Sequence, residues 1–169
     1  MTTPRGFDFD AWLDDAERPE RAVTVYQRAS LIADLDALEA KINAADDEDV
    51  DGPSMGGGVG KLHAEYAKLA QQFHDSALTF RIRAHDEAEK RAIAEAHPGI
   101  DATERGRIVI ADAIQSPKVT PGQLKRLEEK IGEVQFSQIV VAYQKACTDL
   151  PSVSADFLPK PFTRGDGGE

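Results

Sequence analysis

Two short stretches of alternating apolar and polar residues, separated by two helical patterns, constrain the fold of this chain most strongly. The stretches are RAVTVYQ, residues 21–27, and LTFRIRA, residues 78–84. Both are rich in β-branched and aromatic residues, and a period of two places their apolar side chains on one face of an extended backbone. We therefore predict a short strand at each stretch, with the two strands adjacent in space.

The residues between these strands have the periodicity of two amphipathic helices. SLIADLDALEAKINAA and KLHAEYAKLAQQFHDSA repeat apolar residues every three or four positions, which gives each helix one apolar stripe. The stripes consist of Leu31, Leu35, Leu38 and Ile42, and of Leu62, Tyr66, Leu69 and Phe73. An acidic, glycine-rich linker over residues 46–60 separates them, and its composition predicts flexibility. This order predicts an antiparallel helical hairpin above a two-stranded antiparallel sheet.

The second half of the sequence is predicted to be helical. Helical patterns cover DEAEKRAIAEAH, ATERGRIVIADAI, SPKVTPGQLKRLEEKI and GEVQFSQIVVAYQKAC, and Thr120 followed by Pro121 is typical of a helix start. The predicted fold class is mainly α, of the α+β kind, in which a C-terminal helical bundle and a disordered tail follow the hairpin and sheet. The predicted organisation is an arm at 1–19, a strand and hairpin module at 20–84, a helical module at 85–150 and a flexible tail at 151–169.

Charge and composition exclude several classes of protein. The 169 residues carry a net charge of -10, which argues against a general binder of nucleic acid or anionic membranes, because both require a positive field. The N-terminus lacks the apolar core of a signal peptide, and no apolar run is long enough to span a membrane. Cys147 is the single cysteine, so no disulfide within the chain is expected, and we predict a small buried residue. A cytoplasmic protein is expected.

No catalytic, cofactor or metal site is predicted. SMGGGVGKL, residues 54–62, resembles a phosphate-binding loop, but Met55 occupies the position of its first glycine and Leu62 that of its Ser or Thr. The acidic residues before it lack the calcium-loop pattern, and the four histidines lack zinc-site spacing. We therefore expect a non-enzymatic protein without cofactors.

Apolar residues in excess of one buried face point instead to a protein partner. In the last predicted helix they cover a wide arc, and others follow in the proline-rich tail, where burial in the chain's own core is difficult. Phe136 and Ile139 fit a core position equally well. The candidate partner-binding residues are Val140, Val141, Tyr143, Phe157, Leu158 and Phe162. The aromatic residues before residue 20 can pack on the main body or on a partner.

Three segments together resemble the tail assembly chaperones of siphoviruses that infect actinobacteria. ERAVTVYQRASLIADLDALEAKI resembles their opening strand and helix, and LTFRIRAHDEAEKRAIAEAHP resembles their second strand, acidic helix and His-Pro stop. ADAIQSPKVTPGQLKRLEEKIGEVQFSQIVVAYQKAC resembles their paired C-terminal helices. The resemblance covers residues 20–150 and rests on the order and spacing of these motifs.

This resemblance implies a chaperone that binds the long, helical tape measure protein, keeps it soluble and promotes assembly of the tail tube around it. It implies contacts with the tape measure protein and the tail tube protein, and is compatible with self-association or binding to a longer form made by ribosomal frameshifting. The expected location is the cytoplasm of the infected bacterium, and not the mature virion. Two alternatives stay open: a structural head–tail or tail protein of the virion, and a helical adaptor unrelated to phages.

Overall fold

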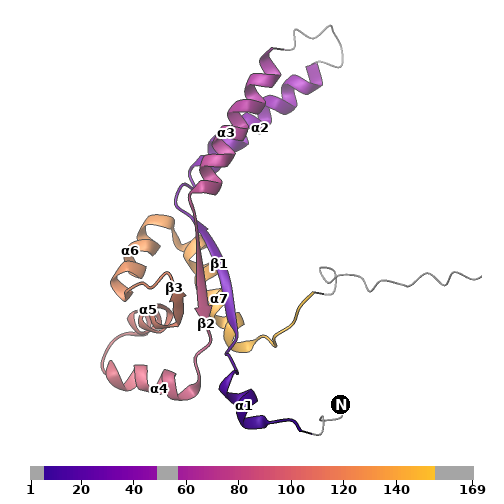
Figure 1. Cartoon of the computed structure of the whole chain (residues 1–169). Coiled ribbons are helices and arrows are strands. Elements are labelled where there is room, and N and C mark those ends of the chain that lie inside the picture. Colours follow the sequence, from indigo (N-terminus) through magenta and orange to yellow (C-terminus); the bar gives the residue numbers. More distant parts are fainter. Residues whose placement is uncertain (1–5, 49–56, 155–169) are drawn as a thin grey trace, which may run out of the picture.

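The computed structural model describes residues 6–48 and 57–154, and within these ranges the protein is mainly helical with one antiparallel sheet (Figure 1). The predicted α+β class is therefore confirmed. The elements in chain order are α1 (Phe9–Asp14), β1 (Glu20–Tyr26), α2 (Leu31–Glu48), α3 (Gly58–Asp75), β2 (Ala77–Arg83), α4 (Glu87–Ala96), α5 (Ala102–Ala113), β3 (Ile114–Ser116), α6 (Pro121–Ile131) and α7 (Glu133–Thr148).

The two predicted strands pair with each other, as their matched alternation indicated. β1 and β2 are antiparallel over seven residue pairs, from Glu20 opposite Arg83 to Tyr26 opposite Ala77. Between them α2 and α3 pack against each other and project from the body as a hairpin (Figure 1). Tyr26 stacks on Phe73 at the base of this hairpin, with ring centroids 4.2 Å apart. The predicted strand and hairpin arrangement is confirmed.

The prediction of a two-stranded sheet is wrong, because a third strand is present. β3 pairs antiparallel with the far edge of β2, where Ile114 lies opposite Ile82 and Ser116 opposite Arg81. The sequence predicted Ile114 as the last apolar residue of a helix, and α5 ends one residue earlier. A three-residue strand has no room for alternation, so periodicity could not separate it from the helix end. Both apolar side chains of the Ile114–Ile82 pair are fully buried.

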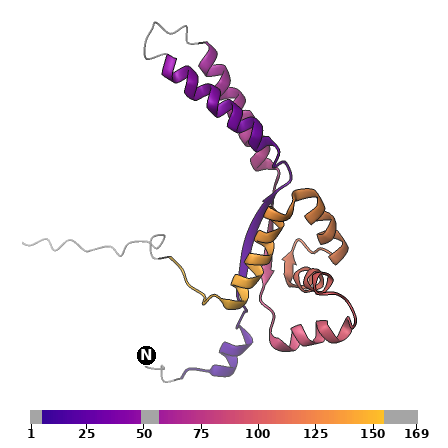
Figure 2. The same cartoon turned by 180° about the vertical axis from the view of Figure 1, so that it is seen from behind.

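One face of the sheet forms the core and the other is polar. α7 packs on β1 and β2, and it lies in front of the sheet in the view of Figure 2. Because side chains alternate along a strand, the apolar set of β1 and β2 lies under α7, whereas Thr24 and Thr79 pair on the opposite face with their hydroxyl oxygens 2.7 Å apart. The largest fully buried side chains are Phe80, Ile82, Ile114, Leu124 and Ile139.

Side-chain hydrogen bonds cap the start of α6, a helix that lines two large surface grooves. Thr120 accepts a hydrogen bond from the Gln123 backbone N–H at 3.1 Å, and the Gln123 side chain accepts one from the Thr120 N–H at 2.8 Å. Pro121 occupies the first turn, where its missing N–H costs nothing. The predicted start at Thr120 and Pro121 is confirmed.

Gln135 of α7 closes part of the free edge of the sheet. Its side-chain oxygen accepts a hydrogen bond from the Tyr26 backbone N–H at 2.8 Å, and its nitrogen donates to the Tyr26 carbonyl at 3.2 Å. The amide thus replaces a neighbouring strand for one residue of β1, which would otherwise present both backbone groups to solvent or to another chain.

We expect Gln135→Ala to lower the free energy of unfolding by about 1–2 kcal/mol, because both backbone groups of Tyr26 lose a protein partner. Gln138→Ala, nearly one turn further along α7 at an exposed position, is the matched control and should change it by less than about 0.5 kcal/mol. Urea denaturation of both variants measures the difference. Equal midpoints would show that the Tyr26 contact adds no stability.

Candidate partner-binding site

An apolar groove runs between α5, α6 and α7 and contains two of the residues predicted to bind a partner. Its volume is about 480 Å³. Val140 and Tyr143 of α7 form one wall, and Val109 and Ile110 of α5 form the other. The remaining lining residues are Ala102, Thr103, Arg105, Gly106, Arg107, Glu128, Phe136 and Gln144. We call this hollow the α5–α7 groove.

The helical repeat of α7 divides the predicted surface. Val140 and Tyr143 are three residues apart and share one face, whereas Val141 is rotated by about 100° from Val140. Val141 lines a separate, more polar depression with Arg21 and Asp149 beside β1. The structure therefore brings Val140 and Tyr143 together and separates Val141 from them. Of the alternatives left open, Phe136 and Ile139 are core residues.

Charged side chains border the α5–α7 groove. The Arg107 guanidinium donates to Glu128 at 3.0 Å, which ties α5 to α6, and Arg105 lies two residues closer to the start of α5. Gly106 leaves a gap in the α5 wall, since a side chain there would meet nothing within 4 Å of its Cβ. An apolar floor with a charged border suits one face of an amphipathic helix.

A polar network around the buried His85, which includes the groove residue Tyr143, was not predicted from the sequence. The His85 side chain is fully buried and has two partners, the Tyr143 hydroxyl at 3.0 Å from Nδ1 and the Asp112 carboxylate at 2.8 Å from Nε2. These residues join the end of β2 to α5 and α7. The only sequence signal is a histidine directly after an apolar strand, at the start of a capped helix.

Tyr143 is a neutral hydrogen-bonding group in this network. Burial raises the pKa of its hydroxyl far above the usual value, and a hydrogen bond with Cys147 acts in the same direction. The hydroxyl thus stays protonated, while the ring faces the groove. Cys147 itself is exposed, so the prediction of a buried cysteine is wrong. It lies one turn beyond Tyr143 on the same side of α7, near the exposed C-terminal end of the helix.

Several of the other predicted features lie at least partly outside the described residues. Phe157, Leu158 and Phe162 lie outside the described residues, as does the first part of SMGGGVGKL. The remainder of that motif forms the first turn of α3, which begins at Gly58. Within residues 6–48 and 57–154, no three His, Cys, Asp or Glu side chains gather as a possible metal site. Helices in the same ranges are too short or too polar to cross a membrane.

The α5–α7 groove thus has an apolar floor and a charged border. We compared the chain with family models, curated proteins and solved structures. None of them matches. A functional assignment therefore depends on the residues of this chain and on the motifs that resemble tail assembly chaperones.

Proposed function

We propose that this protein is the tail assembly chaperone of a siphovirus of actinobacteria. In this proposal it binds the phage tape measure protein in the cytoplasm of the infected host, keeps it soluble and presents it for assembly of the tail tube. The chain acts by binding alone, without catalysis or a cofactor. It leaves before the virion is complete.

The observation that carries this proposal is the α5–α7 groove, which lies in the part of the chain that resembles the chaperones' C-terminal helices. Tape measure proteins are long and helical, so each exposes repeated apolar stripes before the tail is built. A groove with apolar walls and a charged border covers such a stripe. The net charge of -10 would keep the resulting complex dispersed.

Co-expression with the tape measure protein of the same phage is the direct test. We expect the tape measure protein to be mostly insoluble alone and mostly soluble with this chain, and the two to elute together in size-exclusion chromatography. The partition between supernatant and pellet measures the effect. Equal insolubility with and without the chain would contradict the proposal.

The alternatives predict different results in purified particles. A structural head–tail or tail subunit would be present in the mature virion at a fixed number of copies, whereas a chaperone would be absent. Mass spectrometry of purified virions decides between them. An adaptor unrelated to phages would neither appear in virions nor solubilise the tape measure protein.

A further inference from the structure

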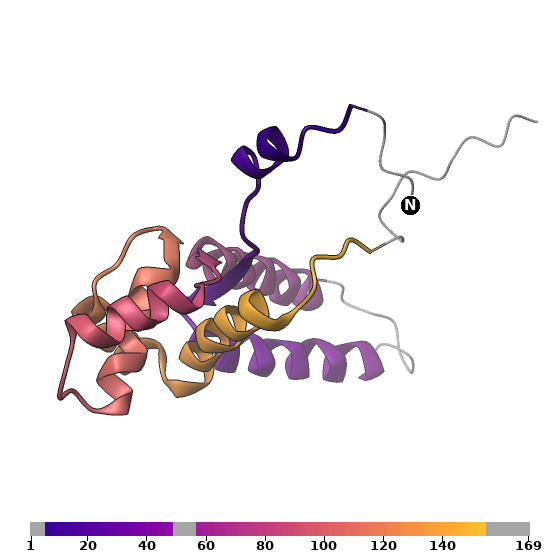
Figure 3. The same ribbon diagram turned by 90° about the horizontal axis from the view of Figure 1, so that it is seen from below.

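The N-terminal arm exposes the most concentrated apolar surface among the described residues. Phe7, Phe9, Trp12 and Leu13 are each about half exposed, at 49, 57, 54 and 48%. Phe9 and Trp12 stack on each other, with ring centroids 5.8 Å apart and an angle of 11° between the planes. The arm projects from the body (Figure 3). Its aromatic rings contact one another, and none of these four residues belongs to the hydrophobic core cluster. Such a patch on a strongly acidic protein is typical of an interaction site.

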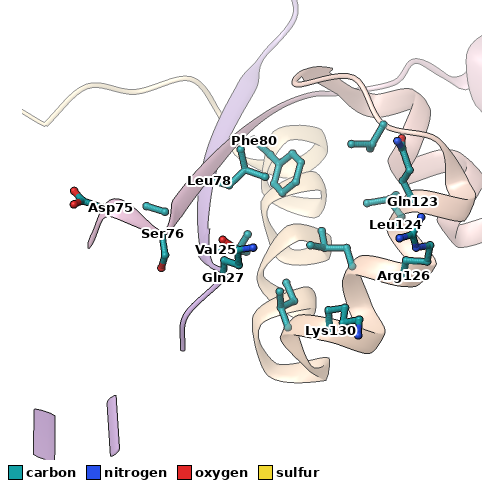
Figure 4. Close-up of a pocket in the computed structure, with 14 residues that line it drawn as sticks. Val25, Gln27, Asp75, Ser76, Leu78, Phe80, Gln123, Leu124, Arg126 and Lys130 are labelled. Carbon is teal, nitrogen blue, oxygen red and sulfur yellow. The ribbon is translucent and has the colours of Figure 1, made fainter. Parts of the chain in front are cut away.

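A second and larger groove lies at the other end of the sheet and is open to solvent. It has a volume of about 660 Å³, within the range of about 300–1,000 Å³ that buries small apolar groups well. Figure 4 shows its floor at Val25, Leu78 and Phe80 and its wall along α6. Leu78 is 42% exposed there, although it lies on the core face of the sheet. We call this hollow the α6 groove.

Arm and groove have complementary patterns of apolar and charged residues. In α1, Phe9, Trp12 and Leu13 form one face, and Asp10 and Asp14 flank it at a spacing of four residues. Arg126 and Lys130 have the same spacing on the α6 wall, which puts both cations on one side of the apolar floor. The acidic Asp75 lies on the opposite, strand side of the groove, where it accepts a hydrogen bond from Gln71 at 2.7 Å.

The arm of one molecule is held too far from the groove of the same molecule. Arg18 forms ion pairs with Glu89 and with Asp86, the latter at 2.7 Å, and the Pro19 carbonyl accepts a hydrogen bond from Ala84 at 3.0 Å. The base of the arm is therefore fixed beside the first residue of β1, whereas the cations of the groove lie near the end of β1. Residues 20–27 span about 23 Å at about 3.3 Å per residue. The connector from Asp14 to the anchored Arg18 is four residue steps long and spans at most about 14 Å, which is shorter than this distance.

We propose that the α6 groove is a docking site for the N-terminal arm of a second copy of this chain. The apolar face of α1 covers Val25, Leu78 and the α6 wall, and its acidic flank faces Arg126 and Lys130. One arm buries roughly 300–400 Å² of its own apolar surface, taking half of each aromatic side chain's usual area. This is a small contact, so the association should occur at micromolar concentrations and weaken at high salt. The proposal does not depend on the chaperone function.

Trp12 is the single tryptophan of the chain, so its fluorescence reports the contact in the purified protein. We expect its emission to shift to shorter wavelength as the protein concentration rises, in parallel with the mass measured by analytical ultracentrifugation. Phe9→Ser with Trp12→Ser should weaken self-association at least tenfold by ultracentrifugation. Val134→Ser, which also removes a strongly exposed apolar side chain but lies outside both grooves, should leave self-association unchanged.

A charge exchange identifies the two partners of the contact. Arg126→Glu with Lys130→Glu, and separately Asp10→Lys with Asp14→Lys, should each abolish self-association. All four positions are exposed, so the variants should fold, which circular dichroism verifies. A mixture of the two variants should associate again, because lysines on one arm then meet glutamates in the other groove. A wild-type chain that stays monomeric, a Trp12 emission independent of concentration, or a mixture that stays dissociated would each overturn the proposal.

Discussion

Gly106→Leu is expected to abolish the solubilising effect of this protein on the tape measure protein while increasing its own stability. The leucine side chain would enter the α5–α7 groove, where a Cβ at this position meets nothing within 4 Å. It would occupy the space proposed for the partner's apolar stripe. Because glycine inside a helix is unfavourable, the substitution should raise the free energy of unfolding by about 0.5–1 kcal/mol. Because the variant is expected to be more stable than the wild type, a loss of its solubilising effect would be due to a blocked groove and not to unfolding.

Gly122→Leu is the matched control for this experiment. It makes the same substitution in the first turn of α6, at an exposed position that lines neither groove. This variant should keep the tape measure protein soluble. The measurement is the soluble fraction of the co-expressed tape measure protein, together with urea denaturation of each variant. If the Gly106 variant solubilises as well as the control, the partner binds elsewhere on the chain.

Local periodicity predicted the strands and helices whose packing follows from apolar residues repeated within one segment. The alternating residues of 21–27 and 78–84 form β1 and β2, because one face of each strand is buried and the other is polar. The helices α2 and α3, which lie between these strands in the sequence, pack against each other in the hairpin because each has one apolar stripe. These features depend on neighbours within one segment, which a sequence displays directly.

Features that require distant segments to meet could not be predicted in this way. β3 is a strand only because Ile114 fits beside Ile82, and its three residues carry no pattern of their own. The partner-binding prediction named Val140, Val141 and Tyr143 together, since a wide apolar arc does not reveal which part of it faces the core. The position of β1 beside α7 separates Val141 from the other two. The exposed state of the N-terminal aromatic residues likewise depends on where the arm is anchored.

The hydrogen bonds of His85 could not be predicted from the sequence either. His85 and Asp112 are 27 residues apart and His85 and Tyr143 are 58 apart, so no spacing in the sequence links them. In the fold they connect the end of β2 with α5 and α7, and Tyr143 then presents its ring to the α5–α7 groove. This network therefore positions one wall of the candidate site.

We expect His85→Ala to lower the free energy of unfolding by about 2–4 kcal/mol, because it removes two hydrogen bonds and leaves a cavity under α7. The Tyr143 hydroxyl would lose its histidine partner in a buried setting, whereas Asp112 is exposed and can turn to water. His97→Ala is the matched control, since His97 is exposed at the end of α4 and should change stability by less than about 0.5 kcal/mol. Urea denaturation compares the two variants. Similar midpoints would mean that His85 contributes neither packing nor hydrogen bonding to the folded state.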